Sequence, residues 1–249
     1  MSFDDPIVFP GKPGAAHLHA FFGNTAADAN STADSLRNSG NSTCRGGIVN
    51  RSAYWVPALI DAKGKPVKPS SIEVYYKSGY YGVRPSAIQN MPEGLRMIAG
   101  SAKAAAAQTY AYWGCHENYI GKSGSIPNCQ AGDSVTLVIE FPQCWDGKNL
   151  DSADHASHMA YAQGGCPASH PVAIPAITFN VLYSQPSGGT AGYRLASDMY
   201  SASQPGGFSA HGDWWNGWQP EISKTFVENC VEPALDCHSH LLGDGRAMF

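Results

Sequence analysis

Residues 53–60 read AYWVPALI, a run of aromatic and branched apolar residues that predicts a strand. Residues 72–77 (IEVYYK), which follow a Lys-Gly-Lys-Pro turn, predict the next one. Working outward along the chain, further strands are expected at Arg96–Ala99, Thr109–Trp113, Ser134–Glu140, Ala176–Tyr183 and Gly192–Ala196. Strands do not alternate with helices, and no repeat period is present. The pattern therefore favours an all-β sandwich or jelly-roll-like fold with long decorated loops.

A few short helices are expected between these strands. They are Thr32–Arg37, the alanine-rich run Ser101–Gln108 and Ile222–Asn229. The chain of 249 residues fits one domain spanning residues 1–249, and its apolar content of 43% is enough for a sizeable core. Charged residues make up 14% and the net charge is −4, so nothing indicates a nucleic-acid partner.

Seven cysteines indicate an oxidising compartment. None form a Cys-x-x-Cys pair, which argues against a structural zinc knuckle. Neighbours in sequence suggest the disulfides Cys115–Cys129, Cys144–Cys166 and Cys230–Cys237, although spacing alone does not fix the connectivity. Cys44 would then be left over, either buried and inert or paired in place of another.

No signal peptide or transmembrane stretch is visible, and Met-Ser-Phe directly before DDPIVFPG is consistent with a mature sequence given a new initiator. We therefore expect a secreted protein, extracellular or periplasmic, without a membrane span. The sequence leaves the oligomeric state open.

Six of the nine histidines lie in short, chemically dense motifs. Imidazole titrates near neutral pH and is the commonest metal ligand, so the motifs look like parts of one site. His17 and His19 in HLHAFFGN would point the same way on a strand. The alternative is a pair of structural histidines bonded to loop carbonyls.

The densest motif is DSADHASHMAY. His155 and His158 would share one face of a helical turn, Asp151 or Asp154 could orient an imidazole, and Tyr161 could exchange a proton. The alternative is a capped turn whose Asp and Ser side chains bind backbone amides.

The other two motifs are CPASHP, with His170 in a stiffened loop, and SAHGDWWNGW. In the latter, His211 and Asp213 are acceptable zinc ligands or an acid–base pair, and the indoles could stack on sugar rings. The alternative places the tryptophans in the core. The candidate substrate-binding residues are Arg96, Trp145, His170, Trp214, Trp215 and Trp218. Metal roles for His116, His238 and His240 are less favoured.

Longer motifs resemble a family of uncharacterised secreted domains from bacteria and filamentous fungi. They are HLHAFFGN, AYWVPAL, GLRMIAG, the stretch from Phe141 to Tyr161, CPASHPVAIP and HGDWWNGW, and they span nearly the whole chain. The resemblance implies secretion and, in fungi, the company of carbohydrate-associated modules. It supplies no established reaction.

The favoured hypothesis is an extracellular enzyme that cleaves a polysaccharide or related glycan. Its catalytic residues would be drawn from His17, His19, His155, His158, Tyr161, His211 and Asp213. In a metal version, a subset of the histidines and Asp213 binds a divalent ion, for which zinc is the first candidate. In a metal-free lyase, a histidine and Tyr161 move protons while Arg96 neutralises a substrate carboxylate. The alternatives are a non-catalytic glycan-binding module with a structural His/Trp cluster, and a metal-binding surface protein.

Overall fold

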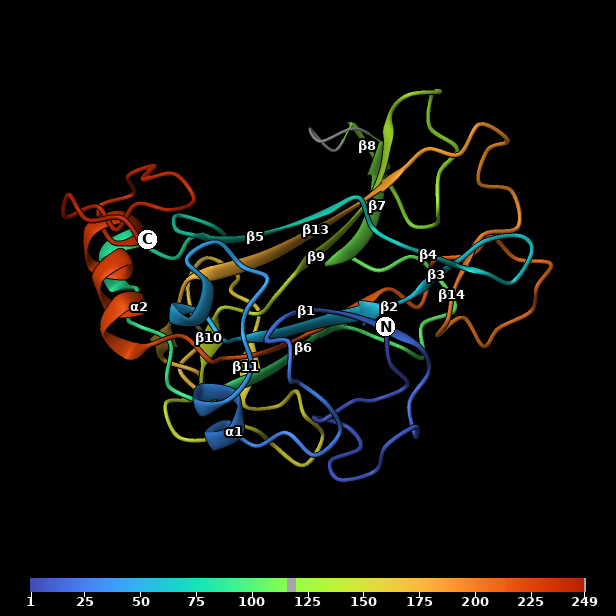
Figure 1. Cartoon of the computed structure of the whole chain (residues 1–249). Helices are drawn as coiled ribbons and strands as arrows, with labels where there is room; N and C mark the ends of the chain where they lie inside the picture. The colour runs from blue at the N-terminus through green and yellow to red at the C-terminus, as the bar shows by residue number, and fades with distance from the viewer. Residues whose placement is uncertain (116–119, 249) are drawn as a thin grey trace.

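A computed structural model describes residues 1–115 and 120–248 and shows two antiparallel sheets packed face to face (Figure 1). The four-stranded sheet has the order β1 (His19–Gly23), β2 (Ala53–Pro57), β15 (His211–Trp215) and β6 (Arg96–Gly100). The five-stranded sheet has the order β5 (Ser71–Lys77), β13 (Ala176–Ser184), β9 (Ser134–Glu140), β7 (Ala111–Cys115) and β8 (Ile120–Ser123). The expected all-β sandwich is confirmed.

Two small sheets and short helices complete the chain. The small sheets are β11 (Met159–Ala160), β10 (Cys144–Trp145) and β12 (Val172–Ala173), and β14 (Arg194–Leu195), β3 (Leu59–Ile60) and β4 (Pro66–Val67). The helices are α1 (Ala33–Asn38), α2 (Pro220–Phe226), the 3-10 turns Gly47–Val49 and Pro85–Ala87, and a π-helical turn Val227–Val231. No helix among the described residues has the length and apolar character needed to cross a bilayer.

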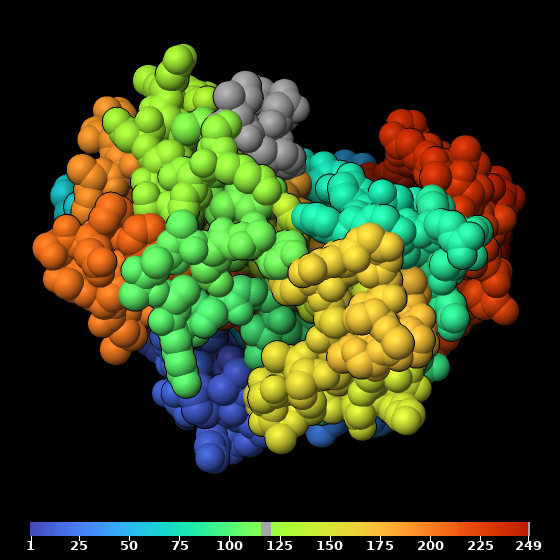
Figure 2. All heavy atoms as spheres, turned by 180° about the vertical axis from the view of Figure 1, so that it is seen from behind, coloured from blue at the N-terminus to red at the C-terminus, as the bar shows by residue number. Residues whose placement is uncertain are grey.

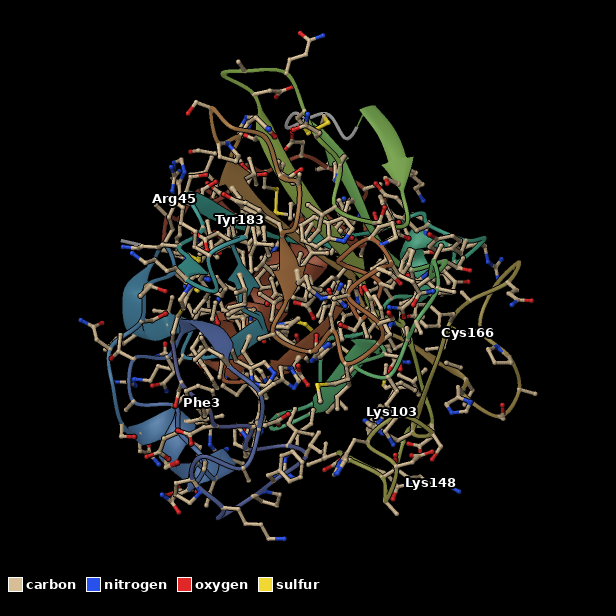
Figure 3. All side chains as sticks on the ribbon, turned by 90° about the vertical axis from the view of Figure 1, so that its right-hand side faces the viewer. Phe3, Arg45, Lys103, Lys148, Cys166 and Tyr183 are labelled. Carbon is tan, nitrogen blue, oxygen red and sulfur yellow. A yellow bond between two sulfur atoms is a disulfide. The ribbon has the colours of Figure 1, made fainter. Side chains whose placement is uncertain are left out.

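The main core lies between the two sheets, where strand alternation sends every second side chain inward. Tyr54 of β2 packs edge-on against Phe179 of β13, with ring centroids 5.6 Å apart. Gly212 of β15 lies so close to Phe179 that a Cβ there would approach the ring at 3.2 Å. Figure 3 shows Tyr183 among these packed side chains and Lys148 on an outlying loop.

A second, smaller cluster covers the outer face of the four-stranded sheet. Trp55 and Trp215 are fully buried there beneath Ile7 of the N-terminal loop and Leu36 of α1. The N-terminal segment and α1 lie below this sheet in Figure 1. The outer face is therefore lined by a second layer of chain, which allows polar groups on it to be buried.

The structure confirms most of the expected elements and corrects two. The expected strand 53–60 divides at Ala58, because β2 ends at Pro57 and β3 pairs with a different sheet. The expected helix Ser101–Gln108 is wrong: the segment forms turns, and the Gln108 side-chain amide donates to the carbonyls of Phe208 and Ala210. A short uncapped alanine run gains too little from helix formation to compete with such tertiary bonds.

The three expected disulfides are all present, and Cys44 is the cysteine left unpaired. The Cys144–Cys166 bond joins β10 to the loop before His170. The expected helix at Thr32 is also present, because the Thr32 side chain accepts from the amide of Ser35 and begins α1 at Ala33.

The packing of Phe179 gives a direct test of the sandwich. We expect Phe179→Ala to lower the free energy of unfolding by about 3–5 kcal/mol, because the ring fills the space between the sheets. Leu235→Ala, at a residue 62% exposed, is the control and should change it by about 0.5 kcal/mol or less. Chemical denaturation measures both, and equal effects would contradict the packing described.

Candidate metal centre

Three histidines converge on the outer face of the four-stranded sheet. His17 lies in the loop before β1, His19 is the first residue of β1, and His211 is the first residue of β15. Both strands pair with β2, so they lie on either side of it. One ring nitrogen from each histidine lies within 4.8 Å of the other two.

Backbone carbonyls fix the tautomers of two of these rings. His19 Nδ1 lies 2.9 Å from the carbonyl of Asp4, and His211 Nδ1 lies 2.8 Å from the carbonyl of Ser209. A carbonyl only accepts, so each Nδ1 carries the proton and each Nε2 presents a lone pair. Metal-ligating histidines in proteins are oriented by the same kind of bond.

The described groups do not supply a proton donor for each of these inward-facing lone pairs. His17 Nε2 lies 3.2 Å from His211 Nε2, and the buried His19 Nε2 has no hydrogen-bond partner among the described residues. An unpaired buried acceptor is costly. Zinc–nitrogen bonds of about 2.0–2.1 Å in a tetrahedron place ligand nitrogens about 3.3 Å apart, close to the spacing of His17 and His211.

Burial keeps all three imidazoles neutral. It lowers the pKa of His17 to about 4 and that of His211 to about 4, where the nearby His17 adds to the effect. For His19, burial and the two neighbouring imidazoles together hold the pKa well below its usual value. Neutral imidazole is the form that binds a metal, so the donor set fits a divalent cation such as zinc.

Asp213 shares the outer face of β15 with His211 but is not one of the three converging ligands. Its carboxyl is buried, and Oδ2 has no hydrogen-bond partner in the described part of the chain. Burial, with a smaller contribution from the nearby Asp5, raises the pKa of Asp213 well above its usual value. Burial therefore disfavours the charged form of the Asp213 carboxyl.

Arg96, Asp151 and His155 form a separate polar group at the other end of β15. Asp151 accepts from Arg96 Nη1 at 3.0 Å and lies 3.0 Å from His155 Nδ1. The guanidinium also lies over the Trp215 ring, 4.1 Å from its centroid. Arg96 pairs with Trp215, which lies four residues further along β15 than His211. At about 3.4 Å per residue, the backbone position of Arg96 is therefore about 14 Å along the strand from that of His211.

The remaining histidines of the dense motifs are bound elsewhere. His158 is buried, with Nε2 2.7 Å from the carbonyl of Arg96 and Nδ1 2.9 Å from the Ser152 hydroxyl. His170 Nε2 lies 3.0 Å from the carbonyl of Ser157. Of the six histidines whose motifs look like parts of one site, three converge, and His155, His158 and His170 make hydrogen bonds to other groups. His116 lies outside the described residues, and His238 is exposed beside Asp236.

The aromatic residues expected to bind substrate also lie in places other than an exposed binding surface. Trp214, Trp215 and Trp218 are 0%, 0% and 6% exposed, so their faces pack in the interior and present no platform to a glycan. Trp145 is half-buried, and its indole N–H donates to the carbonyl of Asn149. Tyr161 donates its hydroxyl to the carbonyl of Glu140, in a tyrosine-lined pocket that sequence reasoning missed.

Two substitutions distinguish a structural from a ligating histidine. His158→Ala should lower the free energy of unfolding by about 1–3 kcal/mol, because it removes a buried ring and leaves the partly buried Arg96 carbonyl without its partner. His17→Ala, at a half-buried loop residue, should change stability less in metal-free protein. If His158→Ala left the unfolding free energy unchanged, the structural role would be contradicted.

Comparison with known proteins gives a family but no characterised relative. No curated protein and no solved structure matches the chain. One family model, described as a domain of unknown function (DUF1996), matches residues 5–218, a stretch that includes all three converging histidines and ends before α2. The chain therefore belongs to the DUF1996 family of domains of unknown function.

Proposed function

We propose that this protein is an extracellular enzyme that binds a divalent metal ion and cleaves a polysaccharide or related glycan. Zinc is the first candidate for the ion. The observation that carries the proposal is the convergence of His17, His19 and His211, with two tautomers fixed and one buried lone pair unpartnered. Three disulfides support an oxidising compartment such as the cell exterior.

Three protein ligands favour a catalytic over a purely structural metal, because structural zinc normally has four. A zinc ion so bound supplies a Lewis acid and lowers the pKa of a coordinated water. His17 is half-buried, while His19 and His211 are buried, so the centre opens towards solvent on the His17 side. Hydrogen bonds to backbone carbonyls already orient the rings of His19 and His211, so these rings need little reorganisation when a metal binds.

Other groups on the same face supply binding and proton chemistry. Burial raises the pKa of Asp213, which favours its protonated form as a proton donor. Asp151 takes one of the five N–H donors of Arg96, so the guanidinium keeps capacity for a hydroxyl or carboxylate of the substrate.

The arrangement favours hydrolysis over the metal-free lyase. The lyase needs Tyr161 and a histidine beside one substrate, but Tyr161 lies against Glu140 and not with the three histidines. The non-catalytic glycan-binding alternative relied on exposed tryptophan rings, and these rings are buried in the core. The observation that still favours a binding role is the tyrosine-lined pocket on the other sheet.

Metal analysis of untagged protein tests the proposal first. We expect about one zinc-like ion per chain, lost in His17→Ala and His211→Ala and retained in the matched loop variant His170→Ala. Full metal content in the first two variants would contradict the assignment.

Activity is tested on the same proteins with a panel of polysaccharides, measuring new reducing ends and unsaturated products. We expect reducing ends without unsaturated products, abolished by a chelator and restored by zinc. Turnover that persists without metal, or in His17→Ala, would refute the metal enzyme. Metal binding with glycan binding but no turnover would instead identify a binding module.

A further inference from the structure

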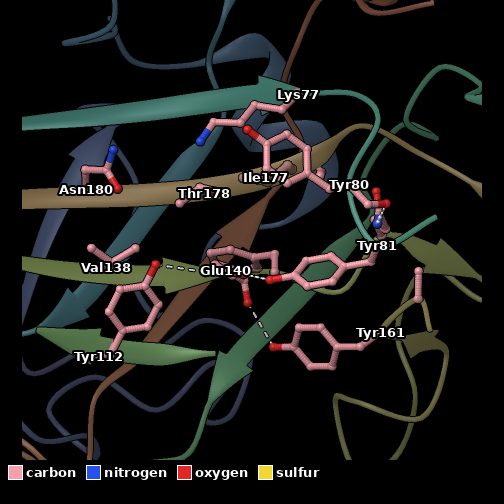
Figure 4. Close-up of a pocket in the computed structure, with 14 residues that line it drawn as sticks. Lys77, Tyr80, Tyr81, Tyr112, Val138, Glu140, Tyr161, Ile177, Thr178 and Asn180 are labelled. Atoms are coloured by element: carbon pink, nitrogen blue, oxygen red, sulfur yellow. Dashed lines mark hydrogen bonds between the residues drawn. The ribbon is translucent and has the colours of Figure 1, made fainter. Parts of the chain in front are cut away.

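A pocket separate from the metal centre lies on the outer face of the five-stranded sheet, which packs against the sheet that carries the histidines (Figure 4). Its floor is made by outward-facing residues of neighbouring strands, with Tyr112 on β7, Glu140 on β9 and Thr178 on β13. Lys77 at the end of β5 and the loop that carries Tyr80 and Tyr81 close one side. The cavity measures about 150 Å³.

Tyrosine rings form the walls, and the fold holds them rigidly. Tyr80 and Tyr81 are 44% and 43% exposed, so their rings border the opening. Tyr161 stacks on Tyr110 with centroids 3.7 Å apart, and Tyr81 meets Tyr110 edge-on at 6.0 Å. Aromatic faces of this kind pack against the C–H faces of a ligand ring.

The backbone of Tyr81 is itself unusual. Its φ of 53° lies in the left-handed region, which a bulky residue rarely adopts. The carbonyl of Tyr81 accepts from the amide of Gly165, and Gly82 packs against Gly164 so closely that a Cβ would lie 2.6 Å from its Cα. The segments 78–85 and 160–170 accordingly lie side by side in Figure 2. Strain of this kind concentrates at functional sites.

Polar groups with unused bonding capacity face the cavity. Glu140 accepts from the hydroxyls of Tyr81 and Tyr112 and forms an ion pair with Lys122 Nζ at 3.7 Å, but a carboxylate offers about four acceptor positions. Gln143 is 2% exposed; its amide N–H donates to the carbonyl of Tyr80, while its Oε1 has no partner within the described residues. Lys77 Nζ lies over the rings of Tyr75 and Tyr80, and burial lowers its pKa.

We propose that this pocket binds a single sugar ring, such as the end unit of a glycan. Hydroxyl groups are the ligand that matches both acceptors, Glu140 and Gln143, and the donor Lys77 at once. Tyrosine faces supply the matching surface for the ring. The cavity is smaller than the ~300–1,000 Å³ of pockets for drug-sized ligands, which fits one ring and excludes a long segment. The proposal does not depend on the metal centre.

An array of immobilised mono- and oligosaccharides, followed by titration calorimetry with the best ligand, tests this site in the whole chain. We expect saturable binding that weakens about tenfold or more in Tyr81→Asn, which removes the ring but tolerates the left-handed backbone. Glu140→Gln should weaken binding similarly while keeping the shape of the side chain.

Two controls separate this site from general damage and from the metal centre. Met199→Ala removes an exposed side chain that lies outside the pocket, and should leave binding unchanged. His17→Ala should also bind normally, so loss of the metal site and loss of this site are distinguishable. Absence of binding to every sugar on the array, or equal binding by wild type and correctly folded Tyr81→Asn, would overturn the proposal.

Discussion

The hydrogen bonds from two imidazole Nδ1 atoms to the carbonyls of Asp4 and Ser209 decide how the candidate centre works. They turn the Nε2 lone pairs of His19 and His211 inward, towards His17. Buried lone pairs that face one another destabilise the metal-free protein unless a proton or a cation bridges them. Neutral His17 can supply one proton, to His211, and burial makes further protonation unfavourable, so a cation is the group that would satisfy all three nitrogens at once.

The sandwich provides the frame that this arrangement needs. β2 pairs with both β1 and β15, so the first residues of these two strands are brought to the same end of the sheet. The N-terminal loop then covers the outer face, supplies the Asp4 carbonyl and buries Trp55 and Trp215. One face of a single sheet thus carries the three histidines, the buried Asp213 and, further along, the Arg96 group. The tyrosine pocket occupies the outer face of the other sheet.

Much of the frame could be predicted from sequence, because apolar alternation and β-branched residues mark strands such as Ser134–Glu140 directly. β15 was not among the predicted strands. Its sequence, HGDWW, contains glycine and aspartate, which are depleted in strands, and only tertiary burial makes it one. The His-x-His spacing did indicate a site at His17 and His19. Which distant histidine joins them depends on sheet order, which no local pattern records.

The same limit explains the residues that were misplaced. His155 and His158 are as dense in sequence as any metal motif, yet Asp151 and Ser152 of the same motif bind them, and the distant Arg96 carbonyl accepts from His158. Trp214 and Trp215 of the HGDWWNGW motif point to opposite faces of a strand that is covered on both sides, so both are buried in the core. The tyrosine pocket draws on five separate segments, and no short motif announces it.

Anomalous diffraction from zinc-loaded crystals tests the central claim most directly. The account predicts one strong peak, about 2.0–2.1 Å from the Nε2 atoms of His17, His19 and His211, with the two Nδ1–carbonyl bonds retained. A peak bound instead by His155, His158 or surface carboxylates, with the three imidazoles uncoordinated, would contradict it.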